Sequence, residues 1–206
     1  MQQGHYLSFQ LGILLFLVRG LLLSQEMSFW YRNERMFHGY RRRDSTSAAV
    51  PKYENGGYRV MKISSREEFE KHNMFGMGQP NEAFAQFFIG DSFLNPLTKP
   101  GESVVGLANV NFAPGCRNNW HIHHAKSGGG QMLICTAGEG WYQEEGKEAV
   151  SLTPGTVINI PAEVKHWHGA KKDSWFSHIA VEVPGEETSN EWCEPVSDEE
   201  YAKLPE

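Results

Sequence analysis

The sequence predicts an all-β fold, either a small β-barrel or a sandwich. Three observations support this prediction: apolar and polar residues alternate over many short segments, Gly and Pro separate these segments, and helical periodicity is almost absent. At 206 residues the chain is long enough for one well-packed core. Its twelve Phe and six Trp are residue types that favour strands.

Residues 1–60 differ from the rest of the chain. The apolar run 11–18 is interrupted at Arg19 and Gly20, so it is shorter than the roughly 20 residues that a membrane span needs. It also makes a poor signal peptide, because no Lys or Arg precedes it and no small-residue cleavage site follows. We interpret residues 1–60 as an N-terminal arm without regular structure and residues 61–206 as one domain.

Met61 offers a second explanation for this arm. It begins a plausible protein start, and the codons of Gly56 and Gly57 just upstream can read as a bacterial ribosome-binding sequence. Under this hypothesis residues 1–60 are a start-site artefact that translates upstream DNA. A cytoplasmic location is expected in either case, and a secreted or periplasmic one only if residues 1–23 are a genuine signal.

A short helix is expected near the start of the domain, over residues 64–72. Either Ser64 or Ser65 can cap it, with Glu67 or Glu68 in the spacing of a capping box.

The apolar segment 83–97 is expected to be a strand followed by a turn that contains proline. Its first part, residues 83–94, is our candidate for the edge through which two copies form a homodimer. A last short helix is expected after Ser197, which precedes Glu200 by three residues.

A strand over residues 104–115 ends at Pro114 and Gly115. Its alternation places Val104, Ala108, Val110 and Phe112 on one face and Val105, Leu107, Asn109 and Asn111 on the other. We expect the two asparagines to point inward, where a barrel holds a wet cavity.

Five of the nine histidines fall between Gly115 and Ala170. His121 and His123 project to the same face of a predicted strand, because side chains in a strand repeat with a period of two. The sequence alternates again over later segments, and residues 141–152 read as a hairpin; the further predicted strands are 131–140, 154–161, 166–170 and 175–183.

Composition excludes some classes of function. The formal net charge of −6 offers no basic surface for nucleic acid. The three cysteines are widely spaced, which argues against a disulfide framework and fits a reducing compartment.

Two motifs in this stretch resemble those of the cupins, small β-barrels of jelly-roll topology. The first cupin motif is Gly, five residues, His-x-His, then Glu, six residues and Gly; this chain has Gly115, then His121 and His123, then Gln131 and Gly138.

The second cupin motif is Gly, five residues, Pro-x-Gly, two residues, His, three residues and Asn. This chain has Gly155, Pro161, Glu163 at the glycine position, His166, and Ala170 at the asparagine position. The resemblance covers residues 104–200 and implies that 61–206 is a single cupin domain with short flanking helices.

Gln131 and the inserted Ser-Gly-Gly-Gly before it narrow the resemblance to particular groups of cupins. Cupins associated with carboxymuconolactone decarboxylases look similar in this insertion and around Lys165–Ala170. Bacterial cupin hydroxynitrile lyases look similar in the Gln and around Lys165–Ala170, but they lack the long glycine spacer. The resemblance implies one divalent transition-metal ion held by His121, His123, Gln131 and His166. It also implies active-site roles for His168 and His178, whereas His124 is expected to point away.

The chemistry of these residues agrees with that implication. Three imidazoles and one amide oxygen form a mixed nitrogen and oxygen site for Mn, Fe, Zn, Co or Ni. A neutral Gln131 in place of Glu leaves such a site one charge more positive, which strengthens the ion as a Lewis acid. His168 or His178 is then placed to exchange a proton with a small-molecule substrate. A Gln131 that lines the cavity without binding the ion, and histidines 168 and 178 that only make hydrogen bonds, are the alternatives.

Three functions remain open at this point. The first is a metal-dependent enzyme with lyase chemistry of the hydroxynitrile-lyase type on a small oxygenated organic molecule. The second is an iron dioxygenase-type cupin. The third is a ligand-binding barrel without catalysis, auxiliary to a carboxymuconolactone-decarboxylase-type enzyme.

Overall fold

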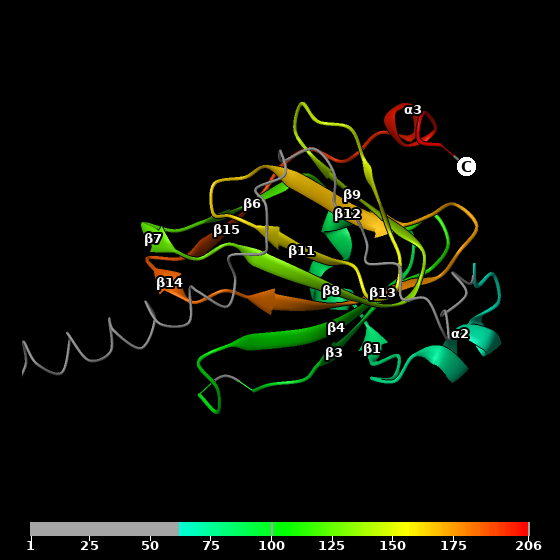
Figure 1. Ribbon diagram of the computed structural model, residues 1–206, viewed down its shortest axis with the longest axis horizontal. Helices are drawn as coiled ribbons and strands as arrows, with labels where there is room; N and C mark the ends of the chain where they lie inside the picture. Colours follow the sequence, from blue (N-terminus) through cyan, green and yellow to red (C-terminus); the bar gives the residue numbers. More distant parts are fainter. Residues whose placement is uncertain (1–61, 100, 206) are drawn as a thin grey trace, which may run out of the picture. The chain divides into compact units, whose positions relative to one another are not determined.

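The computed structural model describes residues 62–99 and 101–205. The expectations for the N-terminal arm and for the start at Met61 lie outside these residues. The described residues are mostly strands, arranged as two main sheets, with one short helix near the start and one near the end of the described chain (Figure 1). This confirms the all-β prediction, and the arrangement is consistent with a jelly roll. No helix within the described ranges is long and apolar enough to cross a membrane.

The first sheet has six strands in the order β1-β3-β4-β13-β8-β11. Its strands are β1 (Gln79–Pro80), β3 (Ser92–Pro96), β4 (Gly106–Phe112), β13 (Phe176–Glu182), β8 (Gln131–Gly138) and β11 (Val157–Ile160). All neighbours in this sheet are antiparallel.

The second sheet follows the order β10-β9-β12-β5-β2; β6 joins it by pairing with β12, and β15 pairs with β6. Its strands are β10 (Val150–Leu152), β9 (Gly140–Glu144), β12 (His166–Ala170), β5 (Arg117–Asn118), β2 (Phe88–Ile89), β6 (His121–His124) and β15 (Ser189–Trp192). The hairpin expected over residues 141–152 is therefore present as β9 and β10.

The two α-helices in the described part of the chain begin where the capping signals predict. Ser65 caps α2 (Arg66–His72) by accepting a hydrogen bond from the backbone N–H of Glu68. Ser197 and Glu200 form a complete capping box on α3 (Asp198–Tyr201). Both N-termini are local features of the sequence, so sequence alone locates them.

The expected strand over residues 83–97 is wrong in its first part. Glu82–Phe87 form a 3₁₀ helix, η2, which leads into the short strand β2 and then into β3. The aromatic side chains explain the difference, because Phe87 stacks on Trp192 of β15 with ring centroids 4.6 Å apart. Tertiary stacking thus overrides the apolar pattern of the segment.

The prediction divides the residues of β4 correctly into two faces, but it assigns the wrong face to the interior of the barrel. Val110 and Phe112 belong to the core between the sheets, whereas Asn109 and Asn111 lie on the opposite face beneath the segment that follows α2. There Asn111 accepts a hydrogen bond from Asn73, and both β4 asparagines donate to the Gly76 carbonyl. They are buried but satisfied by this loop rather than by a wet cavity.

Two positions of the cupin-like motifs adopt a positive φ. Gly138 has φ 66°, and an added Cβ would lie 1.7 Å from the Trp175 carbonyl oxygen, so only glycine fits. Glu163 occupies the glycine position of the second motif and still adopts φ 69°. Its carboxylate is held by the backbone N–H of Ala125 at 3.0 Å and by His124 at 2.6 Å, and these contacts oppose the backbone strain.

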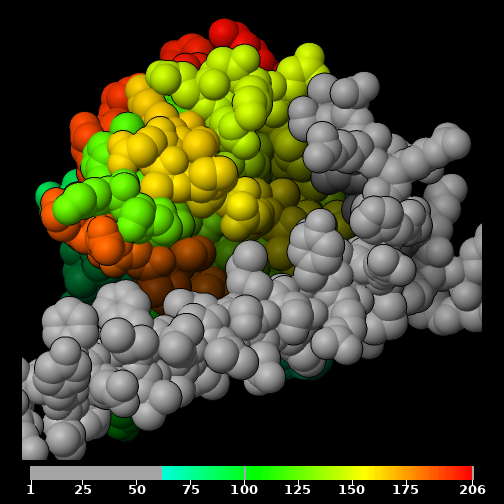
Figure 2. Space-filling model, turned by 60° about the vertical axis from the view of Figure 1, so that its left-hand side comes forward, coloured from blue at the N-terminus to red at the C-terminus, as the bar shows by residue number. Residues whose placement is uncertain are grey.

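The inserted glycine segment forms a small ribbon of its own. Ser127–Gly128 (β7) pairs with Gly185–Glu186 (β14), and Lys126 contacts Glu187 beside it. In Figure 2 the green and orange residues of this ribbon lie side by side on the surface.

Candidate metal centre

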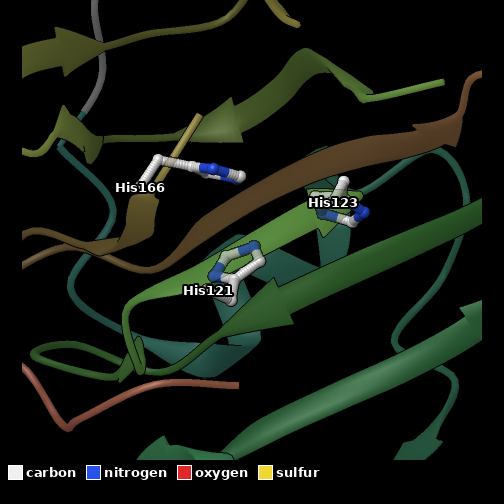
Figure 3. A group of neighbouring side chains, drawn as sticks. All are labelled: His121, His123 and His166. Carbon is white, nitrogen blue, oxygen red and sulfur yellow. The ribbon is translucent and has the colours of Figure 1, made fainter. Parts of the chain in front are cut away.

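Three buried histidines converge from two strands of the second sheet. His121 and His123 lie on β6 and His166 lies on β12, and one ring nitrogen from each lies within 4.8 Å of the others. Figure 3 shows His121 and His123 on one strand and His166 reaching in from another. The period of two explains the pair on β6, where Ile122 between them faces the other way.

Hydrogen bonds fix the orientation of two of these rings. His121 Nδ1 lies 3.0 Å from the carbonyl oxygen of Asn119, and His166 Nδ1 lies 2.9 Å from that of Val164. A carbonyl only accepts, so both Nδ1 atoms carry the hydrogen and both Nε2 atoms keep a free lone pair. Such a partner behind the ring is typical of metal-binding histidines.

Burial keeps the rings of His121 and His166 neutral. It lowers the pKa of His166 to about 4, and it lowers the pKa of His121 well below its ordinary range. Neutral imidazole is the form that binds a metal. Within the described residues, His166 Nε2 and both ring nitrogens of His123 are buried without a hydrogen-bond partner. A divalent transition-metal ion would satisfy such atoms, so the residues present fit the ion that the sequence implies.

Gln131, the fourth expected ligand, begins β8 and lines the same cavity as His121 and His123. Its Nε2 lies 3.4 Å from Glu182 Oε1. Its own Oε1 is buried and lacks a partner in the described part of the chain. The structure thus brings Gln131 to the cavity with an amide oxygen free to accept, and its role as a ligand stays a prediction.

His168 and His178, the expected acid–base residues, face each other in this cavity. His178 Nε2 lies 3.2 Å from His168 Nδ1, across the gap between β12 and β13. Burial lowers the pKa of His178 to about 3 and lowers that of His168 strongly, so both are neutral at pH 7. In this neutral pair one ring nitrogen donates a hydrogen bond to the other.

Asn118 on β5 holds His168 from the other side. Its Oδ1 accepts the backbone N–H of His168 at 2.9 Å, so its NH₂ group must face the imidazole ring, 3.1 Å from Nε2. This buried amide fixes both the backbone and the ring of His168.

The cavity beside these residues has a volume of about 200 Å³. Its wall is mixed: polar groups come from the histidines, Asn118, Gln131 and Glu182, and the apolar side comes from Phe84, Phe88, Leu94, Ala108, Val110 and Trp192. A neighbouring cavity of about 290 Å³ shares His123, Glu182 and Asn190. A space of this size and character suits one small organic molecule.

His124 lies apart from the three histidines, as expected. It is absent from the cluster and instead contacts Glu163 and Glu191. Trp120 and Trp167 pack in a cluster with Trp141 and Val196.

Sequence reasoning missed Asn118, Glu182 and Trp192. The position of Glu182 could have been predicted from the sequence, because it lies on the same face of β13 as His178 and Ala180. The positions of Asn118 and Trp192 could not, because long-range pairing brings them to the site. The Trp192 ring lies 4.9 Å from that of His121.

Comparisons with known proteins place the chain in a family. No protein-family model matches the chain. It is 38% identical over 120 residues to a protein named (R)-mandelonitrile lyase from Granulicella tundricola, a match that spans 58% of this chain and 88% of that protein. A cupin-like protein of known crystal structure from Thermotoga maritima is 36% identical, with 64% of this chain and 96% of that chain covered and a TM-score of 0.56. The chain therefore belongs to the cupin family.

Proposed function

We propose that this cupin is a metal-dependent lyase that cleaves small aromatic hydroxynitriles to an aldehyde and hydrogen cyanide, and catalyses the reverse addition. The observation that carries the proposal is the His168–His178 pair, 3.2 Å apart, in a cavity next to three convergent histidines. The name of the relative from Granulicella tundricola supports the same reaction.

The ion would be held by His121, His123 and His166, with the Gln131 amide oxygen as fourth ligand. When bound, it would act as a Lewis acid that stabilises negative charge on the substrate oxygen. The donor set suits several divalent ions, namely Mn, Fe, Co, Ni and Zn.

The protein's own residues move the proton. The neutral His168–His178 pair takes the proton from the substrate hydroxyl as the bond between the carbinol carbon and the nitrile carbon breaks. The electron pair of that bond leaves with cyanide, and the carbinol carbon becomes the aldehyde carbon. The pair then returns the proton to cyanide, which departs as hydrogen cyanide, and both rings are neutral again.

The apolar side of the cavity would hold the rest of the substrate. Phe84, Phe88 and Trp192 offer aromatic surface against which a phenyl ring packs. Their burial of that ring also excludes water from the reacting carbon.

A homodimer in the cytoplasm remains our expectation for the assembly. Sedimentation equilibrium of the purified chain measures the assembly state directly.

The test is a reconstitution assay. Metal-free protein loaded separately with Mn, Fe, Co and Zn is given mandelonitrile, and benzaldehyde release is followed by absorbance. We expect release with at least one ion, and loss of it in His168→Ala and His178→Ala at unchanged metal content. His124→Ala, outside the cluster, is the matched control. Inactivity with all four ions would overturn the proposal, and oxygen uptake by the iron-loaded protein would favour a dioxygenase instead.

A further inference from the structure

The Glu182 carboxylate lies between two of the proposed metal ligands. Its Oε2 is 3.5 Å from His123 Nδ1, and its Oε1 is 3.4 Å from Gln131 Nε2. The arrangement follows from strand register, because Glu182 at the end of β13 pairs directly with Gln131 at the start of β8. The same carboxylate lines the cavity that holds the histidine pair.

The Glu182 carboxylate faces one polar atom of each neighbour. An ionised carboxylate only accepts hydrogen bonds. Gln131 therefore turns its NH₂ group towards Glu182, whereas His123 Nδ1 faces the same carboxylate without a hydrogen bond to it.

The atoms left over then point to the proposed ion. Gln131 Oε1 and His123 Nε2 are buried and have no hydrogen-bond partner in residues 62–99 and 101–205. Both are lone-pair donors, as an ion requires. The two contacts of Glu182 are long for hydrogen bonds, so charge and orientation carry its effect more than bond strength does.

We propose that Glu182 is a positioning residue that orients Gln131 and His123 towards the metal and supplies the negative charge that the neutral amide lacks. The proposal rests on the metal site of the proposed function and not on the lyase reaction. It amends the expectation of a site one charge more positive than that of a glutamate-ligated cupin. The site keeps one negative charge, but the carboxylate that carries it contacts the ligands Gln131 and His123 instead of binding the ion.

Metal affinity tests the role of Glu182. Metal-free wild type, Glu182→Gln and Glu182→Ala are titrated with Zn²⁺ and with Mn²⁺ in competition with a chromophoric chelator at pH 7. We expect Glu182→Gln to weaken binding by about 10- to 100-fold, the range typical of residues behind metal ligands, and Glu182→Ala by more, because it also loses the acceptor. Glu191→Gln is the matched control, since that carboxylate contacts His124 outside the cluster.

A charge exchange separates positioning from a structural role. In Gln131→Glu/Glu182→Gln the carboxylate moves onto the ion, and affinity is expected to return to within about tenfold of wild type or to exceed it. Unchanged affinity in both single variants overturns the proposal. The proposal is also overturned if the exchange variant does not restore the metal affinity lost in the single variants and the metal-free proteins lose thermal stability in parallel. A wild type that binds neither ion overturns the metal site itself, and the proposed function with it.

Discussion

Acid stability of the metal-free protein tests whether the buried histidines are neutral. His178 is fully buried and its pKa is lowered from 6.5 to about 3, so below pH 6.5 the unfolded chain binds a proton that the folded chain excludes. A histidine whose pKa is depressed in the folded state therefore costs stability as the pH falls from 6.5 towards 3. At pH 5 this cost is about 2 kcal/mol for one such histidine and is close to zero at pH 7.5.

The perturbation is His178→Asn, which removes the titrating ring from the cavity. Urea unfolding of chelator-treated protein at pH 7.5 and pH 5 gives the loss of unfolding free energy for each form. We expect wild type to lose about 2 kcal/mol more than His178→Asn over this interval. The comparison uses the pH dependence and not absolute stability, so a general destabilisation by the substitution does not affect it.

His124 provides a control of opposite sign. Contacts with Glu191 and Glu163 raise its pKa, so its contribution to stability is present below pH 6.5 and is lost as the pH rises through the folded value. His124→Asn should therefore make the loss of stability on acidification larger, whereas His178→Asn makes it smaller. Equal pH dependence in wild type and His178→Asn would refute the neutral, buried pair.

Three further predictions follow from contacts of single residues. Asn118→Ala leaves the buried backbone N–H of His168 without its acceptor, so urea unfolding should show a loss of about 1–3 kcal/mol, with a fall in benzaldehyde release at unchanged metal content. Gly138→Ala forces a Cβ against the Trp175 carbonyl at positive φ, and calorimetry should show destabilisation of about 3 kcal/mol or failure to fold; a stable variant would contradict this close approach. Glu163→Ala should melt at a lower temperature than Glu163→Gly, because alanine keeps the strained φ and loses the carboxylate contacts, and the reverse order would contradict the strain.

Local spacing carried most of the successful predictions. The two capped helices, the shared face of His121 and His123, and the hairpin at 141–152 each depend on residues close in sequence. The motif spacing of Gly155, Pro161 and His166 also led to the correct fold family.

The failures depend on contacts between distant segments. Alternation in β4 separates Asn109 and Asn111 from Val110 and Phe112, but it does not say which face meets the core. The loop after α2 accepts hydrogen bonds from both asparagines, and no pattern in the sequence predicts these contacts. The 3₁₀ helix at 82–87 likewise depends on Trp192, about a hundred residues away.

The pairing of β6 with β15 has a consequence for folding during translation. His121 and His123 are held along one edge by residues 189–192, which come last among all strands of the domain. While the chain is still being synthesised, the ligand strand lacks this partner and the ring of Trp192 that lies against His121. The strand that carries His121 and His123 therefore gains this partner only after residues 189–192 have been synthesised and have paired with β6.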